Sequence, residues 1–295
     1  MANLKDIQRK IKSVKNTEKT TRAMKLVSSA KLKRTEELAK RSRVYADKLT
    51  EVIDEIAQKI QDMGADSNDN IFFMENPNPK KVDIIFITAD KGLCGGFNSQ
   101  TLKRVNTLMD SFKSDDIKVR LNGVGRKGID YYKFNNIEMM REVIGLSSAP
   151  DYEKAAEFIS EIVDAYANGE TDRIIMVHNG YVNMISQEIR EDQVLPIDVS
   201  DVTSGKESKS ELEIEPDDDS SLLVALMKQY IEYSMYYALI DSLAAEHAAR
   251  MQAMDAATTN AKEMVKSLSI QYNKARQEAI TTELIEIISG MESMK

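Results

Sequence analysis

Three glycines have the spacing of a nucleotide-binding turn. Gly123, Gly125 and Gly128 form a G-x-G-x-x-G pattern after a predicted strand and before a predicted helix, which is the local context of the dinucleotide fingerprint. However, the motif follows the second strand of its domain rather than the first. Glu142 has the sequence spacing of the acidic residue that binds the ribose in this motif, but it has no clear position at the end of a strand. We favour glycines that permit a tight turn, with a nucleotide-binding oxidoreductase as the minor alternative.

A second glycine-rich loop, residues 90–98 (DKGLCGGFN), contains the only cysteine, Cys94. The loop lacks the G-K-[ST] ending of a phosphate-binding loop. A nucleophilic thiol needs a base beside it, and no Cys-His pattern is present, so we expect a small thiol in a tight turn. His178 and His247 are too far apart in sequence to suggest a zinc site with Cys94. We therefore predict no catalytic residues, no metal and no cofactor: the chain is not an enzyme by itself.

The composition favours long helices. The 295 residues include 12 glycines and 5 prolines, and 30% of them are charged. A single cysteine excludes an internal disulfide and fits a reducing compartment. Residues 1–43 carry fourteen Lys/Arg and four Asp/Glu, whereas residues 210–295 carry seven Lys/Arg and fifteen Asp/Glu. We favour a basic helix lying beside an acidic helix of the same chain. The other alternative is a basic coiled-coil scaffold, or a nucleic-acid binder that uses the basic segment.

The N-terminal segment has the pattern of a heptad helix. Residues 1–63 lack Gly and Pro, and alternating steps of three and four residues from Leu4 to Ile60 give seventeen seam positions, of which eleven are apolar. Such a repeat is typical of a coiled coil. The six polar exceptions fall within residues 18–42: Glu18, Thr21, Lys25, Ser28, Thr35 and Ser42.

The C-terminal segment repeats the pattern more strongly. Residues 217–289 lack Gly and Pro, and fifteen of eighteen seam positions from Leu223 to Thr282 are apolar. The tyrosines Tyr230, Tyr233 and Tyr237 fall on this seam, so we expect core packing rather than a stacking surface for bases. His247 also falls on the seam, where one polar residue more often sets register than binds metal.

The lengths of these helices imply that they pair. At 1.5 Å per residue they span roughly 85 and 100 Å, too long for the domain between them to cover. Each helix needs a long partner, and one leaves the middle domain as the other returns. We therefore predict that the two helices run antiparallel.

The middle of the chain has a different pattern. Residues 82–88 (VDIIFIT) form an apolar, β-branched run typical of a strand buried on both faces. Predicted helices at 98–112, from 126 and from 150 to 169 alternate with strands at 117–124, near 138–144, at 173–178 and at 182–194. This alternation predicts a Rossmann-like, mostly parallel sheet. The fold class is α/β plus coiled coil, and the expected domains are an N-terminal coiled-coil helix (1–63), a linker (64–81), a central α/β domain (82–199), a linker or foot loop (200–219) and a C-terminal coiled-coil helix (220–295).

The last residues carry a new apolar stripe. The seam pattern stops after Thr282, and Ile280, Leu284, Ile287, Ile288 and Met291 continue on another face. The last helix is also longer than the first, so we expect its tip to extend beyond intramolecular cover. Exposed apolar surface of this size usually has a partner.

Several segments together resemble the gamma subunit of bacterial rotary F-type ATP synthases. Residues 280–290 (ITTELIEIISG) are similar to that family's C-terminal I-T-x-E pattern, and residues 272–277 (YNKARQ), 21–31 (TRAMKLVSSAK) and 90–98 also match. The resemblance covers essentially the whole chain. Met291 stands where the family usually has alanine, and residues 211–214 (ELEI) replace an aromatic-rich form.

The resemblance implies a mechanical function and a set of partners. The family member is the central-stalk rotor, which couples ion flow through the membrane ring to ATP synthesis or hydrolysis at the beta subunits and regulates ATPase activity. It implies alpha and beta subunits (three each), the epsilon subunit and the membrane rotor c-ring as partners. By family position, Arg9, Lys12, Met24, Arg276 and Gln277 contact beta subunits. The apolar tip, Ile280, Leu284, Ile287, Ile288 and Met291, would turn in an apolar sleeve.

The resemblance also implies where the protein is located in the cell. The first fourteen residues lack the continuous apolar segment of a signal peptide, and no stretch approaches the ~18 apolar residues of a membrane span. We expect a peripheral protein at the cytoplasmic face of the cell (inner) membrane, which meets the membrane only through its partners.

Overall fold

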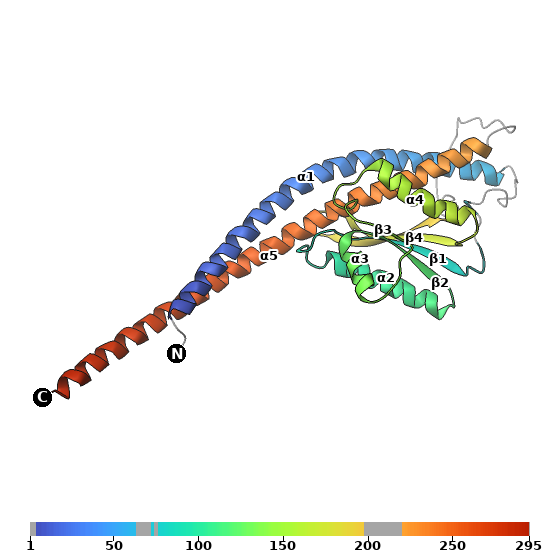
Figure 1. The fold of residues 1–295 in the computed structure, drawn as a ribbon. Helices are drawn as coiled ribbons and strands as arrows, with labels where there is room; N and C mark the ends of the chain where they lie inside the picture. Colours follow the sequence, from blue (N-terminus) through green and yellow to red (C-terminus); the bar gives the residue numbers. More distant parts are fainter. Residues whose placement is uncertain (1–3, 63–71, 74–75, 198–219, 295) are drawn as a thin grey trace. The chain divides into compact units, whose positions relative to one another are not determined.

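Two long helices, α1 (Leu4–Asp62) and α5 (Ser220–Glu292), form the ends of the chain in the computed structural model (Figure 1). The structure describes residues 4–62, 72–73, 76–197 and 220–294. Contacts divide the chain into two units, residues 1–29 with 250–295 and residues 30–249. Each unit contains part of both helices, and the units are described one at a time.

In the first unit, α1 and α5 run antiparallel. The hydroxyl oxygens of Thr21 and Thr258 lie 2.8 Å apart, and Lys25 Nζ lies 2.6 Å from Asp255 Oδ1. From Thr21 to Lys25 the position on α1 advances by four residues. The partner on α5 moves back by three residues, from Thr258 to Asp255, so the two helices run in opposite directions. This pairing confirms the predicted antiparallel coiled coil in this part of the chain.

The second unit shows the same direction of pairing. The Tyr233 hydroxyl donates a hydrogen bond to the Ser42 carbonyl oxygen at 3.1 Å, and Gln229 Nε2 donates to the Tyr45 hydroxyl at 3.2 Å. The rings of Tyr45 and Tyr233 pack edge to face, with centroids 4.4 Å apart. The seam residue Tyr233 thus serves in helix packing, as expected.

The predicted seam of α1 lies against its partner at every position where side chains are described. From Leu4 to Ile53 no seam residue is exposed; Ile56 and Ile60 lie outside the described side chains. The polar exceptions include four buried hydroxyl residues seven positions apart: Thr21, Ser28, Thr35 and Ser42. The Thr35 hydroxyl donates to the Lys31 carbonyl oxygen at 2.9 Å, so its burial does not leave a polar group unpaired.

The seam residues of α5 are likewise shielded from solvent. Every predicted position from Leu226 to Ala279 is buried or half-buried, and Thr282 is exposed; Leu223 lies outside the described side chains. His247 is 7% exposed on this seam. The pattern therefore ends where the sequence indicated.

Five strands form one sheet in the second unit. They are β1 (Lys81–Ile87), β2 (Lys118–Val124), β3 (Arg141–Val143), β4 (Arg173–Tyr181) and β5 (Gln187–Leu195). Their order is β3-β2-β1-β4-β5, parallel except for the antiparallel β4–β5 pair. Together with the paired helices, this sheet confirms the predicted fold class. The domain boundaries stay a proposal, and the predicted connectors lie largely outside the described residues.

Helices cover both faces of the sheet (Figure 1). On one face, Val82, Ile84 and Phe86 of β1 pack with α2 (Phe97–Ser114) and with Tyr132 of α3 (Arg126–Phe134). On the other face, Ile85 and Ile87 pack with α4 (Tyr152–Ala167) and with α5. The run of β1 is apolar apart from Asp83 because successive side chains enter two different cores.

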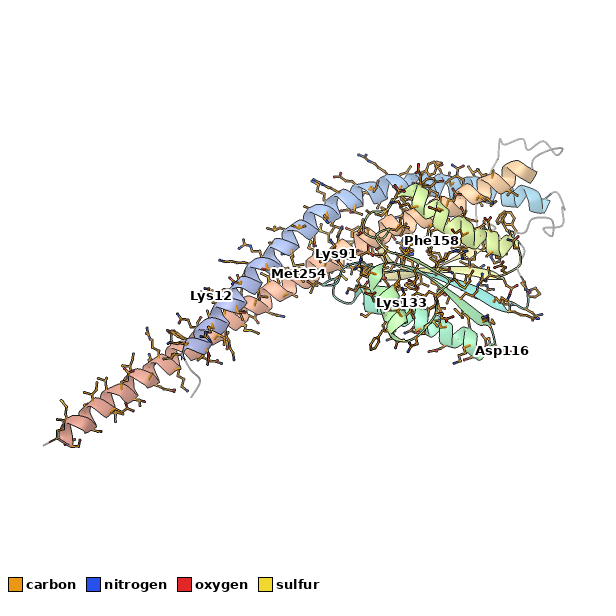
Figure 2. The ribbon with its side chains drawn as sticks, viewed as in Figure 1. Lys12, Lys91, Asp116, Lys133, Phe158 and Met254 are labelled. Carbon is orange, nitrogen blue, oxygen red and sulfur yellow. The ribbon has the colours of Figure 1, made fainter. Side chains whose placement is uncertain are left out.

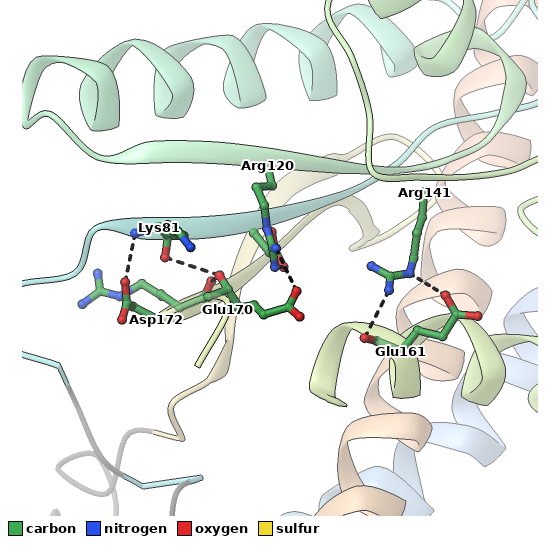
Figure 3. A network of polar contacts seen from close by, with 9 residues as sticks. Lys81, Arg120, Arg141, Glu161, Glu170 and Asp172 are labelled. Carbon is green, nitrogen blue, oxygen red and sulfur yellow. Dashed lines mark hydrogen bonds and ion pairs between the residues drawn. The ribbon is translucent and has the colours of Figure 1, made fainter. Parts of the chain in front are cut away.

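A polar network lies where the sheet approaches α4 (Figure 3). Asp83 is 1% exposed, and both of its carboxylate oxygens accept hydrogen bonds of 2.6 Å from Arg120 on the neighbouring strand. Arg141 of β3 donates to Glu161 of α4 at 2.6 Å. The bidentate pairing balances a charge inside an otherwise apolar strand.

The sequence predicts a strand at 182–194. Residues 187–194 do belong to β5, but residues 182–186 form the turn between β4 and β5. Asn183 Oδ1 accepts hydrogen bonds of 2.8 Å from the backbone N–H groups of Ile185 and Ser186. This side-chain bonding replaces the ladder at the hairpin tip. The exposed residues Val182, Met184 and Ile185 have strand propensity, which explains the misplaced boundary.

The G-x-G-x-x-G segment is a packed turn between β2 and α3. Gly125 has φ +99°, and a Cβ there would lie 1.9 Å from the Thr88 carbonyl oxygen. A Cβ on Gly128 would lie 2.5 Å from the Phe86 ring, and the Thr88 hydroxyl accepts a 3.0 Å hydrogen bond from the Gly128 N–H. The contact between strand and turn therefore requires these glycines, as the favoured interpretation predicted.

Replacing Gly125 by alanine tests this packing. We expect Gly125→Ala to lower the free energy of unfolding by about 3 kcal/mol or more, because strain at positive φ adds to a steric clash. The control is Gly145→Ala, since Gly145 has φ +93° but no atom within 4 Å of its Cβ position, and it should cost only about 1–2 kcal/mol. Urea unfolding measures both, and equal losses would contradict a role for the contact with Thr88.

A double-mutant cycle tests the hydroxyl pair in the seam. We expect Thr21→Val and Thr258→Val to cost about 0.5–1.5 kcal/mol each in unfolding free energy, and the double variant to cost less than both together, because the two hydroxyls bond to each other. Thr21→Val with Thr35→Val is the matched control, since those side chains lie two heptads apart, and it should be additive. Additive losses for the Thr21–Thr258 pair would show that their contact is not an interaction.

Candidate functional site

The turn formed by the G-x-G-x-x-G motif holds the protein's own carboxylate. Asp90 Oδ1 accepts hydrogen bonds from the N–H of Arg126, at the start of α3, and from the N–H of Gly145, at 3.0 and 3.2 Å. Partial burial raises the pKa of Asp90, but these N–H groups outweigh it and hold the pKa below its ordinary value. An ionised carboxylate at a helix N-terminus occupies the place where a phosphate would bind.

The acidic residue of the dinucleotide pattern is also engaged elsewhere. Glu142 lies on β3 and forms an ion pair with Lys133 of α3. It therefore holds the edge strand to the helix beside it. With Asp90 at the turn, the geometry offers no support for nucleotide binding.

Cys94 is a structural thiol. It is 2% exposed and packs with Ala89, Phe97, Ala245 and Ala249. Asn98 Nδ2 donates to its Sγ at 3.3 Å. Within the residues that the structure describes, no cluster of three His, Cys, Asp or Glu side chains could hold a metal ion.

The predicted contact residues of α1 lie on its surface. Arg9 has 81% of its side chain exposed and lies 3.7 Å from Asp6, and Lys12 is also exposed (Figure 2). Met24 is half-buried between the seam residues Thr21 and Lys25. The two basic side chains are exposed to an acidic partner. The Met24 side chain is covered on the side of the helix pair and exposed on its outer side.

Two apolar side chains beside Met24 were not predicted as contact residues. Leu26 is 65% exposed and Val27 is 57% exposed. Both lie outside the heptad seam. An apolar residue at a position that the seam does not bury was the sequence signal that could have identified them. An exposed apolar pair on the outer face of a helix is typical of a surface that packs against a partner.

The predicted contact residues of α5 are also exposed. Arg276 and Gln277 both lie on the solvent side of the helix, and the seam residues beside them, Ala275 and Ala279, are half-buried. The contacts of Thr21 with Thr258 and of Lys25 with Asp255 place Leu4 opposite about residue 275. Arg276 and Gln277 therefore lie where the cover from α1 ends.

The C-terminal end of α5 is an apolar surface without intramolecular cover. Every described residue from Ile280 to Met294 is exposed, and Figure 2 shows side chains standing out all around these turns. The predicted residues Ile280, Leu284, Ile287, Ile288 and Met291 are 48–65% exposed, and Ile285, which the stripe omitted, is 58% exposed. An apolar helix end exposed on all sides fits a partner that encloses it.

Among residues 4–62, 97–167 and 220–294, no helix has both the length and the apolar composition needed to cross a bilayer.

Known sequences place these features in a family. An ATP synthase family profile matches residues 3–294. The ATP synthase gamma chain of Sulfurovum sp. (strain NBC37-1) is 73% identical over 295 residues, and that of Campylobacter curvus (strain 525.92) is 60% identical over 296 residues; each alignment covers 100% of both chains.

Solved structures share the fold. A chain of the Euglena gracilis mitochondrial ATP synthase (OSCP/F1/c-ring, rotational state 3) aligns with a TM-score of 0.67 and 19% identity, covering 99% of this chain and 94% of that one. A chain of the Tetrahymena thermophila mitochondrial ATP synthase central stalk and c-ring has a TM-score of 0.62 at 23% identity, covering 81% and 99%. With a family profile spanning nearly every residue and full-length relatives at this identity, the chain belongs to the ATP synthase gamma chain family.

Proposed function

We propose that this chain is the central-stalk rotor of an F-type ATP synthase. It couples ion flow through a membrane ring to ATP synthesis or hydrolysis at the beta subunits, and it influences the ATPase rate as the part that all three catalytic sites contact. It is itself a non-catalytic subunit and needs no cofactor. The observation that carries the proposal is the exposed apolar end of α5, residues 280–294, in a chain whose relatives are gamma chains.

The paired helices suit the transmission of rotation. The rotor acts by binding the three beta subunits differently at each angle, so that it shifts each site among pre-existing states. The partners are three alpha and three beta subunits, the epsilon subunit and the c-ring. The exposed Arg9 and Lys12 are placed to attract acidic beta-subunit surfaces, with Arg276 and Gln277 as polar contacts.

The apolar tip suits a bearing. Apolar contacts are non-directional, so a helix end that presents Ile280, Leu284, Ile287, Ile288 and Met291 meets similar resistance at every angle. Directed hydrogen bonds would instead favour one angle. Through these partners the chain is a peripheral protein at the cytoplasmic face of the cell (inner) membrane.

The proposal is tested by reconstitution. The chain, co-purified with alpha and beta subunits of the same organism, should form an α3β3γ complex in which a bead attached to the chain rotates when ATP is added. Failure to assemble, or ATP hydrolysis without rotation, would overturn the proposed function.

Deleting residues 286–295 tests the apolar tip. The deletion removes Ile287, Ile288 and Met291, and we expect reduced assembly or a reduced stall torque, because the sleeve loses its apolar contacts. Glu286→Gln with Glu292→Gln is the matched control, since these exposed polar residues lie within the deleted segment. Full torque in the deletion variant would remove the bearing interpretation.

Met24→Lys tests the contact beside the seam. Lys25 already carries a positive charge, which is paired with Asp255. A second ammonium group at the neighbouring half-buried position should bind an acidic beta-subunit surface too strongly, or repel a basic one. We expect ATP hydrolysis to persist while fewer ions are moved per ATP. Membrane vesicles that carry the complete complex measure this ratio. Met24→Leu, which conserves volume, should keep the wild-type value, and an unchanged ratio in Met24→Lys would disprove the contact.

A further inference from the structure

A buried carboxylate on α5 lies directly over the antiparallel end of the sheet. Asp241 is 3% exposed. Its Oδ1 accepts a hydrogen bond of 3.2 Å from the backbone N–H of Tyr181, and its Oδ2 lies 2.9 Å from Arg190 Nη1 and 3.3 Å from His178 Nε2. One carboxylate of the helix thus receives three contacts from the sheet.

The contacts come from two strands at one level. His178 of β4 and Arg190 of β5 are paired residues in the β4–β5 register, so Asp241 lies over a cross-strand pair. Arg190 also lies 3.2 Å from Glu188 Oε1, which orients its guanidinium from the other side. We call His178, Arg190 and Asp241 the Asp241 cluster.

Arg190 and Asp241 form the ion pair of the cluster. Burial would lower the pKa of Arg190, but the Asp241 carboxylate and the Tyr237 hydroxyl outweigh it and raise that pKa above its ordinary value. His178 is 2% exposed, and its Nδ1 lies 3.6 Å from the Asp192 carboxylate. A buried carboxylate that lost these partners would be left uncompensated, which is strongly unfavourable.

The surrounding contacts between α5 and the sheet are of a different kind. Met235, Ala238 and Leu239 of α5 pack in the apolar core that includes Met176 and Ile174 of β4. Such contacts hold two elements together, but they depend weakly on small rotation or sliding. Hydrogen-bonded ion pairs depend on both distance and angle. The Asp241 cluster therefore fixes the helix to the sheet in the directions that apolar packing resists least.

We propose that the Asp241 cluster carries twisting force between the sheet and α5 during rotation. The proposal rests on the proposed function, since only a rotor bears such a load. Asp241 is then a positioning residue: it holds the sheet and the helix at one angle without touching a catalytic site. Its directed contacts have the opposite task to the apolar tip, where free rotation is needed.

The test measures torsional stiffness in the assembled complex. A bead is attached to α2 through Lys113→Cys, an exposed position, while the native Cys94 is buried and does not react. With the α3β3 ring immobilised, the angular variance of the bead during catalytic pauses reports the stiffness of the rotor. We expect Asp241→Asn to raise this variance about two-fold, because directed contacts are lost while apolar packing stays, and Asp241→Glu to restore part of the stiffness.

A matched variant separates load transfer from general destabilisation. Asp83→Asn also removes a buried charge, 1% exposed and paired with Arg120, but this pair lies entirely within the sheet. It should leave the angular variance unchanged. Should Asp241→Asn fail to assemble, Arg190→Gln replaces it, since Arg190 has 28% of its side chain exposed.

The outcomes are distinct. Wild-type complexes that do not rotate would overturn the proposed function and the inference with it. Rotating complexes in which the Asp241 or Arg190 variant keeps the wild-type variance would overturn the inference alone, as would an equal increase in Asp83→Asn. A rise confined to the Asp241 cluster, with an unchanged rate of ATP hydrolysis without load, would support it.

Discussion

The pairing of α1 with α5 is the interaction on which the other features depend. It positions the predicted contact residues of both helices and defines where α5 becomes uncovered. The seam of α1 is unusual in its middle, where hydroxyl residues recur every seven positions: Thr21, Ser28, Thr35 and Ser42. Small side chains let the backbones approach closely, and hydroxyls bonded to a partner or to their own helix avoid an unpaired polar group. The helices thus gain close contact at some cost in apolar area.

The chain separates two kinds of contact along α5. Around Asp241 the contacts are directed and charged, where the helix meets the sheet. From Ile280 onward the exposed surface is rich in apolar side chains. Directed contacts resist a change of angle, and apolar contacts tolerate it. One continuous helix thus makes directed contacts with the sheet at one part of its length and leaves an apolar-rich surface uncovered at another.

Much of this arrangement was predictable because periodicity reports local burial. The seam positions from Leu4 to Ile53 and from Leu226 to Ala279 follow from steps of three and four residues, including the polar ones. The exposed stripe at the tip was visible for the same reason. The Asp241 cluster was not, since His178, Arg190 and Asp241 are distant in sequence and meet only through the β4–β5 register. Leu26 and Val27 were missed because the heptad count follows only the seam, and both residues lie outside it.

The carboxylate of Asp90 determines which anions the turn after β2 can accept. The turn at Arg126 and Gly145 is saturated by an anion that belongs to the chain and cannot dissociate. A second anion such as a nucleotide phosphate would meet repulsion there. The sheet thus keeps the outline of a nucleotide-binding fold, while the turn after β2 is already neutralised by a carboxylate of the same chain.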